Sequence, residues 1–97
     1  MINFWKVYFL KCSDDSIYCG ITTDLERRLS EHTKSRRGSK YTRSRRPVNL
    51  VWYIEVQTRS DASKLESSLK KLSKKKKEKI IELNADHDDI INIIKHT

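Results

Sequence analysis

Two short runs of β-branched and aromatic residues, separated by four polar residues, constrain the fold of this chain most. The runs are Phe4 to Lys11 and Ile17 to Thr22, and Ser13-Asp14-Asp15-Ser16 between them is typical of a turn, so the spacing predicts a β-hairpin. A two-residue loop at Asp14-Asp15 would put Tyr8 and Tyr18 on opposite faces. An odd loop, such as Asp14-Asp15-Ser16, would put both on one face. We expect an odd loop if the two tyrosines act together.

The rest of the chain predicts four helices and a third strand. In chain order we expect a helix opened by Thr23-Asp24-Leu25-Glu26 and running to about Lys34, a basic loop from Ser35 to Arg46, a strand from Val48 to Val56, a helix capped by Ser60 and Asp61 and running to about Leu72, a helix from Ser73 through Leu83, and an amphipathic helix from Asp86 to Lys95. The predicted fold is α+β, with a three-stranded antiparallel-type sheet flanked by helices in the order β-β-α-β-α-α-α.

Composition predicts one small domain with a polyanionic partner. The 97 residues include one Pro and two Gly, so no flexible linker is expected and residues 1–97 are taken as a single domain. The formal net charge of +8 favours nucleic acid over membrane lipid. Without a long apolar run or a signal-peptide pattern, we expect a cytoplasmic protein, or a nuclear one in a eukaryote or virus. Cys12 and Cys19 are expected to be free thiols that serve packing.

Charged residues on two core-facing helix stripes call for an explanation. The first helix turns Leu25, Arg28, Leu29 and His32 to one side, and the second turns Glu66 inward among leucines. A charged group in such a place is costly unless it is paired. One reading is that Arg28 and Glu66 lie at the edge of the stripe or form a structural ion pair. The other is that they belong to a site.

A basic stretch between the first helix and the third strand suits a phosphate backbone. Seven cations fall within residues 34–46, with hydroxyl side chains between them. The run Lys74 to Lys77 either adds to this surface or is a solvated helix face. The residues expected to contact DNA are Arg36, Arg37, Lys40, Tyr41, Arg43, Arg45, Arg46 and, on the second helix, Lys70.

These features together resemble the GIY-YIG nuclease family, in particular its small stand-alone members. The likeness rests on Val7-Tyr8-Phe9, Tyr18-Cys19-Gly20, Arg28 ten residues after the second tyrosine, His32 one turn later, Lys40-Tyr41-Thr42-Arg43, and Glu66, and it covers about residues 5–81, with the last helix at about 86–95 beyond it. Val7 replaces the first glycine of the name motif and Cys19 the middle residue of the second motif. Asn84 is a candidate for the asparagine that many members carry after the glutamate's helix.

The resemblance implies a site and a reaction. Tyr8, Tyr18, Arg28 and His32 would be catalytic and Glu66 would bind one divalent metal ion, Mg²⁺ or Mn²⁺. As a hypothesis, Glu66 holds the ion, Arg28 contacts the phosphate oxygens, and a tyrosine, with Tyr8 preferred, takes a proton from water with help from His32. Such a base needs a tyrosine pKa well below about 10, which Arg28 and the metal would help to supply.

The implied function is therefore that of a metal-dependent DNA endonuclease, selective for DNA structure in repair or recombination by family analogy. RNA stays open as a substrate, and no membrane partner is expected. Two alternatives remain from the sequence. One is a DNA-binding module without turnover. The other is a nuclease subunit that needs a protein partner, suggested by the closely spaced Ile90, Ile91, Ile93 and Ile94 in the last helix.

Overall fold

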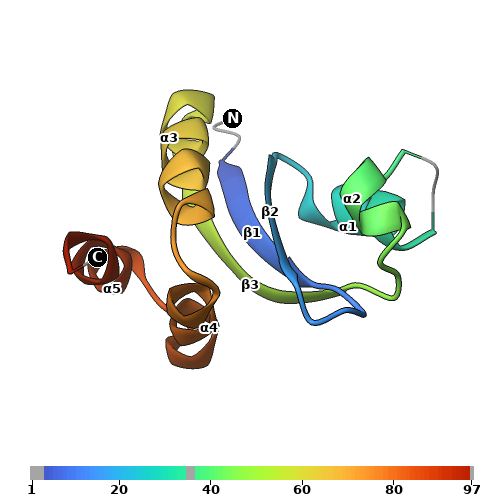
Figure 1. Ribbon diagram of the computed structural model, residues 1–97. Coiled ribbons are helices and arrows are strands. Elements are labelled where there is room, and N and C mark those ends of the chain that lie inside the picture. The colour runs from blue at the N-terminus through green and yellow to red at the C-terminus, as the bar shows by residue number, and fades with distance from the viewer. Residues whose placement is uncertain (1–3, 35–36, 97) are drawn as a thin grey trace.

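A three-stranded antiparallel sheet with helices on both faces forms the protein. The computed structural model describes residues 4–34 and 37–96. The strands lie side by side in the order β2-β1-β3, and Figure 1 shows α1 and α2 to one side of the sheet and α3, α4 and α5 to the other. The elements are β1 (Trp5–Lys11), β2 (Ile17–Thr22), α1 (Leu25–Lys34), α2 (Lys40–Arg43), β3 (Asn49–Val56), α3 (Arg59–Lys70), α4 (Lys74–Leu83) and α5 (His87–Lys95).

The hairpin loop has an odd number of residues, as expected if the two tyrosines act together. Tyr8 pairs with Gly20 across the hairpin and Leu10 with Tyr18, so both tyrosines lie on one face. The register differs from the example that the sequence suggested. The loop is Ser13 to Asp15, because the Cys12 amide donates to the Ser16 carbonyl at 2.9 Å. Asp15 takes a left-handed conformation, φ 69°, that closes this short loop.

The alternation of side chains along β1 feeds two separate cores. Val7 and Phe9 point toward α3, α4 and α5, where Phe9 packs against Trp52 with ring centroids 4.9 Å apart. Tyr8 and Leu10 point the other way, into a smaller cluster beside α1. All four side chains are essentially buried. The central strand is therefore enclosed on both faces, which is why it is almost continuously apolar.

Two of the predicted helix starts are wrong by one or two residues, and two are confirmed. α1 is capped by Asp24, whose carboxylate accepts from the Arg27 amide at 3.1 Å, and not by Thr23. α3 is capped by Thr58, which accepts from the Asp61 amide, so Ser60 and Asp61 lie inside it; it ends at Lys70. Ser73 and Asp86 cap α4 and α5 as predicted. In each case the capping residue accepts, through its side-chain oxygen, from the backbone amide three residues later.

The stretch predicted as a basic loop contains a short helix. α2 spans Lys40–Arg43 and is capped by Ser39, whose hydroxyl accepts from the Thr42 amide at 3.1 Å. The observed order is therefore β-β-α-α-β-α-α-α, with one helix more than the sequence predicted. A single turn has no hydrophobic period of its own, so it leaves no pattern to find.

The last helix packs against the rest of the molecule more closely than its isoleucines suggested. Ile90 is 3% exposed, and Ile93 and Ile94 pack against the main core. Ile91, at 49%, is the isoleucine of α5 that faces water. Trp52 Nε1 donates to the Ala85 carbonyl at 3.1 Å and fixes the link between α4 and α5. Most of the apolar side chains of α5 are thus packed inside the protein. None of the helices within the described residues is long and apolar enough to cross a membrane.

Candidate active site

Tyr8 and His32 form the buried centre of the site. The Tyr8 hydroxyl lies 2.8 Å from His32 Nε2. Tyr8 is 1% exposed and His32 0%. β1 supplies the tyrosine and the inward stripe of α1 supplies the histidine, because Leu25 and Leu29 of that stripe pack in the same cluster. The histidine predicted from helical periodicity is therefore brought to the predicted tyrosine.

Gly20 makes room for the Tyr8 ring. A Cβ atom built on Gly20 would stand 2.5 Å from Tyr8 Oη, closer than real Cβ contacts come, and a tight 3.1 Å from Tyr18 Cε2. Gly20 was part of the motif that carried the family resemblance, but the sequence offered no reason for it. The structure gives one: Gly20 lies opposite Tyr8 in the hairpin, and the ring lies across its backbone.

Two further rings, those of Tyr18 and Tyr41, extend the centre toward solvent. Tyr18 lies 6.4 Å from Tyr8, 5.1 Å from His32 and 5.9 Å from Tyr41, measured between ring centroids. The short helix α2 brings Tyr41 to this cluster, and Arg45 stacks on its ring at 3.8 Å. Tyr18 is half-buried and Tyr41 is 38% exposed. The rings therefore form a path from the surface to the buried hydroxyl.

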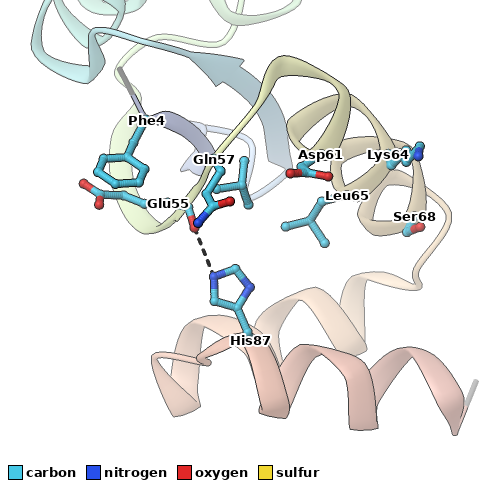
Figure 2. Close-up of a pocket in the computed structure, with 9 residues that line it drawn as sticks. Phe4, Glu55, Gln57, Asp61, Lys64, Leu65, Ser68 and His87 are labelled. Carbon is cyan, nitrogen blue, oxygen red and sulfur yellow. Dashed lines mark hydrogen bonds between the residues drawn. The ribbon is translucent and has the colours of Figure 1, made fainter. Parts of the chain in front are cut away.

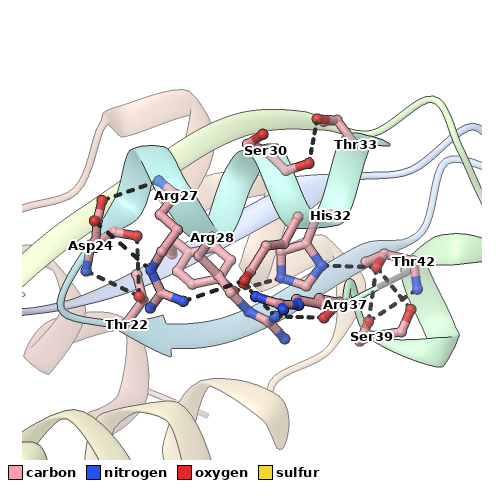
Figure 3. A network of polar contacts seen from close by, with 12 residues as sticks. Thr22, Asp24, Arg27, Arg28, Ser30, His32, Thr33, Arg37, Ser39 and Thr42 are labelled. Carbon is pink, nitrogen blue, oxygen red and sulfur yellow. Dashed lines mark hydrogen bonds and ion pairs between the residues drawn. The ribbon is translucent and has the colours of Figure 1, made fainter. Parts of the chain in front are cut away.

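Arg28 lies beside the tyrosines and is held there by its neighbours. Its Nη1 donates to Glu31 Oε1 at 3.0 Å. It also donates to the carbonyl of Arg37, at 2.9 Å, and Figure 3 shows Arg28 beside Arg37. Glu31 also bonds Arg27. The sequence did not identify Glu31, although its place one turn after Arg28 is a common spacing for an ion pair. Arg28 also lines a shallow hollow with Thr22 and Thr23, so its charge borders water.

The electrostatics of the buried pair differ from the expectation of an acidified tyrosine. Burial raises the pKa of Tyr8 above its ordinary value, and the nearby Tyr18 adds to this, while Arg28 opposes it. Burial, together with Arg28, lowers the pKa of His32 to about 4. Near neutral pH the tyrosine is therefore protonated and the histidine uncharged. Arg28 by itself therefore does not supply the lowered pKa that a tyrosine base needs.

The second ring nitrogen of His32 is bound by a residue that the sequence did not single out. His32 Nδ1 lies 2.8 Å from Thr42 Oγ1, and that hydroxyl also contacts Ser39 (Figure 3). Thr42 is completely buried. Its position inside the motif Lys40-Tyr41-Thr42-Arg43 was the only signal available, since a threonine in a basic segment carries no periodicity. The basic segment thus contributes to the buried centre as well as to the surface.

Glu66 lies in the other layer of the protein, on the face of the sheet opposite Tyr8. It lies on α3, which packs on the opposite face of the sheet and contacts the edge strand β2. Its side chain is 22% exposed and lies 3.5 Å from Lys70 Nζ. Burial raises the pKa of Cys19, the β2 residue between Tyr18 and Gly20, and the charge of Glu66 adds to this. The edge of β2 is therefore where the two layers of site residues meet.

Glu66 suits one hard divalent cation. Among the described residues, no cluster of three His, Cys, Asp or Glu side chains is placed to bind a metal. Mg²⁺ and Mn²⁺ accept oxygen ligands, and Mg²⁺ commonly keeps several waters while taking one or two carboxylates. A single, partly exposed carboxylate meets that requirement, although Lys70 competes for it.

The predicted DNA-binding residues divide into two groups. Arg46 donates to the carbonyls of Glu31 and His32 at 3.0 and 2.7 Å, and Arg45 donates to Asp14 Oδ2 at 2.9 Å, so both brace the fold. Those with exposed side chains are Arg37, Lys40, Tyr41, Arg43 and Lys70. Arg36 lies outside the described residues. As DNA contacts, all of these stay predictions.

The lysine run of α4 is divided in the same way. Lys74 donates to Asp15 and Lys76 to the His96 carbonyl, so these two hold the fold. Lys77 instead lines a hollow at the edge of β2, together with Tyr18, Tyr41 and Lys70. The run is therefore neither a uniform cationic surface nor a uniformly solvated face.

A wider hollow of about 690 Å³ lies on the α3 and α5 side of the sheet (Figure 2). Its polar groups include Glu55, Asp61 and Lys64, which are exposed, and His87, whose Nε2 donates to the Glu55 carbonyl at 3.0 Å. No buried acid–base pair lines it among the described residues. The chemistry concentrates at the tyrosines instead.

The geometry agrees with what comparison with known proteins finds. A family model described as the GIY-YIG catalytic domain matches residues 4–79. This chain belongs to the GIY-YIG family.

Several relatives carry the name UPF0213. The chain is 47% identical over 77 residues to UPF0213 protein DP2720 of Desulfotalea psychrophila, covering 79% of this chain and 70% of the relative. Two solved structures share the fold. UPF0213 protein BH0048 of Bacillus halodurans matches with a TM-score of 0.55 and 38% identity, over 91% of this chain and 93% of that one. Protein EF2693 of E. faecalis matches with a TM-score of 0.59 and 45% identity, over 86% and 90%.

Proposed function

We propose that this protein is a metal-dependent endonuclease that hydrolyses phosphodiester bonds in DNA, with branched intermediates of repair or recombination as its substrates. The observation that carries the proposal is the buried contact of 2.8 Å between Tyr8 and His32, with Arg28 beside it. A tyrosine joined to an uncharged histidine can pass a proton on, which an ordinary packing tyrosine cannot. Membership of the family and the net charge of +8 support the same conclusion.

In this proposal Tyr8 takes the proton of the attacking water as its own proton passes to His32 Nε2. Arg28 pairs with the non-bridging oxygens of the phosphate. Burial lowers the pKa of His32 and the positive field of Arg28 lowers it further. A bound phosphate that offsets this field makes His32 a better proton acceptor. Tyr8 is 1% exposed, so water reaches its oxygen only when substrate binding shifts the side chains around it.

Glu66 would hold the metal ion, Mg²⁺ or Mn²⁺. When bound, the ion supplies charge stabilisation for the leaving 3′-oxygen. Lys70, now 3.5 Å from Glu66, is released and becomes available to a phosphate of the bound strand. DNA would lie over the edge of β2, between the cations of the α2 segment on one side and Lys70 and Lys77 on the other.

A DNA-binding module without turnover is the second candidate. The raised pKa of Tyr8 and the ion pair on Glu66 favour it, since the tyrosine stays protonated and the carboxylate is already paired with Lys70. The alternative of a subunit that needs a protein partner loses most of its motivation, because Ile90, Ile93 and Ile94 are turned inward.

The deciding experiment is cleavage of labelled branched and plain duplex DNA with Mg²⁺, with Mn²⁺ and with a chelator. The wild-type protein is compared with Glu66→Gln and with Glu82→Gln, an equal change of charge at an exposed position of α4. We expect metal-dependent cutting that Glu66→Gln abolishes and Glu82→Gln keeps. Salt-sensitive binding without cutting under every condition would support the binding module instead. Full activity of Tyr8→Phe beside an inactive Tyr18→Phe would move the role of base to Tyr18.

A further inference from the structure

The Thr42 hydroxyl is the centre of a small buried network beside His32. Thr42 Oγ1 lies 2.8 Å from His32 Nδ1, 3.1 Å from the Ser39 carbonyl oxygen and 2.9 Å from Ser39 Oγ. Thr42 and His32 are both 0% exposed, so water does not compete for these atoms. Both ring nitrogens of His32 contact protein groups instead of solvent, so these groups determine which nitrogen is protonated.

The Ser39 carbonyl offers the hydroxyl proton of Thr42 an acceptor. A carbonyl oxygen accepts only, so the contact with Ser39 O requires Thr42 to donate its proton there. The lone pairs of Thr42 Oγ1 then face His32 Nδ1 and accept a proton from it. A neutral imidazole carries one proton, so Nε2 is left bare and accepts from the Tyr8 hydroxyl.

We propose that Thr42 is a positioning residue that holds His32 in the tautomer protonated on Nδ1, which leaves Nε2 free to receive the proton of Tyr8. The catalytic consequence rests on the proposed function, whereas the tautomer itself does not. Ser39 supports the arrangement twice, because its hydroxyl caps α2 by accepting from the Thr42 amide and its carbonyl accepts the Thr42 proton. The turn of helix that carries Tyr41 to the surface thus also fixes the histidine beneath it.

The proton balance depends on this tautomer. Water gives its proton to Tyr8 Oη as the Tyr8 proton moves to Nε2 and forms an imidazolium that still donates from Nδ1 to Thr42. The hydroxide forms the new bond to phosphorus, the bond to the 3′-oxygen breaks, and that oxygen takes a proton from solvent. In the other tautomer Nε2 already carries a proton and donates to Tyr8, so it cannot accept one in the same step.

The tautomer is measurable without DNA or metal. In ¹⁵N-labelled protein at pH 7, long-range ¹H–¹⁵N spectra separate a protonated ring nitrogen from a bare one. His87 and His96 in the same spectrum serve as internal references. We expect a protonated Nδ1 and a bare Nε2 for His32 in the wild-type protein and in Thr42→Ser. Thr42→Val keeps the shape of the side chain but removes the hydroxyl, and we expect it to shift the population toward protonated Nε2.

Cleavage then tests the catalytic consequence. Thr42→Val should lower kcat by about tenfold or more with little change in KM, and Thr42→Ser should restore most of it. A wild-type His32 protonated on Nε2 would overturn the proposal, as would a Thr42→Val protein with an unchanged tautomer. If none of the three proteins cuts DNA, the nuclease function fails, and the spectra still decide the tautomer.

Discussion

Gly20 lies beneath the ring of Tyr8, so closely that a Cβ atom at Gly20 would stand 2.5 Å from the Tyr8 hydroxyl and 2.6 Å from Cζ. The hydroxyl is also the atom that contacts His32. A glycine in one strand therefore sets the position of the reactive group in the next. A methyl group at Gly20 would therefore disturb the contact between Tyr8 and His32 directly.

Gly20→Ala should lower the rate of DNA cleavage strongly and the stability of the fold only modestly. The new methyl group pushes the Tyr8 hydroxyl away from His32, and a displacement of about 1 Å costs about 100-fold in rate when geometry is critical. Overpacking of this kind costs about 1–3 kcal/mol of stability. Cleavage rates and thermal unfolding, measured together, check the two effects. Wild-type cleavage by Gly20→Ala would mean that the Tyr8 hydroxyl has no part in the reaction.

Stability should depend on pH through His32. Its pKa is lowered in the folded protein from 6.5 to about 4, so the unfolded chain binds a proton that the folded protein refuses. Above about pH 6.5 the titration of His32 does not lower the free energy of unfolding. As the pH falls from 6.5 to 4 it lowers that free energy increasingly, by up to about 3 kcal/mol. Below pH 4 its effect no longer changes.

Denaturant unfolding at several pH values tests this dependence. The wild-type protein is compared with His32→Gln, and the advantage of the wild type should shrink between pH 6.5 and 4. His96→Gln, an exposed position at the end of α5, is the matched control and should follow the wild type. A constant difference between wild type and His32→Gln across this range would contradict the lowered pKa.

Arg46 and Arg43 should behave differently although they lie three residues apart. Arg46 donates to the last carbonyls of α1, those of Glu31 and His32, so Arg46→Gln should cost about 1–3 kcal/mol of stability. Arg43 is exposed, so Arg43→Gln should leave the melting temperature unchanged. If Arg43 contacts a phosphate, its loss lowers the salt slope of DNA binding by about one. Equal melting temperatures for the two variants would refute the structural role of Arg46.

Lys70 should compete with the metal ion for Glu66. The two side chains lie 3.5 Å apart and the lysine is 54% exposed, so the ion pair contributes little free energy. Lys70→Gln should therefore tighten Mn²⁺ binding only about two- to fivefold. Paramagnetic relaxation of water by Mn²⁺ measures this in the absence of DNA. Lys71→Gln, the exposed neighbour, removes the same charge and serves as the control. An identical change in both variants would assign the effect to net charge.

Local patterns predicted most of the fold, because the information was local. The alternation in β1 and β2 and the stripe of α1 placed Tyr8, Tyr18 and His32 correctly relative to their own elements. The starts of α4 and α5 were found from their caps. α2 was missed because one turn of helix is held by Ser39 and by its tertiary contacts, and these leave no periodic signal.

The site was less predictable where its residues meet across layers. Nothing local indicates that Thr42 lies against His32, that Arg46 caps α1, or that Glu66 approaches β2 from the opposite face. The raised pKa of Tyr8 was not foreseen either, because it depends on burial, which outweighs the nearby Arg28. Family resemblance supplied the identities of the site residues, and only the three-dimensional contacts supply their protonation.

The hairpin turn is bonded on both sides: Asp14 to Arg45, next to α2, and Asp15 to Lys74, at the start of α4. It is exposed, and exposed loop tips are the usual places to splice in a tag or to open the chain for circular permutation. Here an insertion of one residue would put Tyr8 and Tyr18 on opposite faces or shift the register that pairs Tyr8 with Gly20. A longer insertion would pull the two aspartates off their partners. Engineering of this protein, and natural length variation among its relatives, should therefore avoid the very loop that looks most permissive.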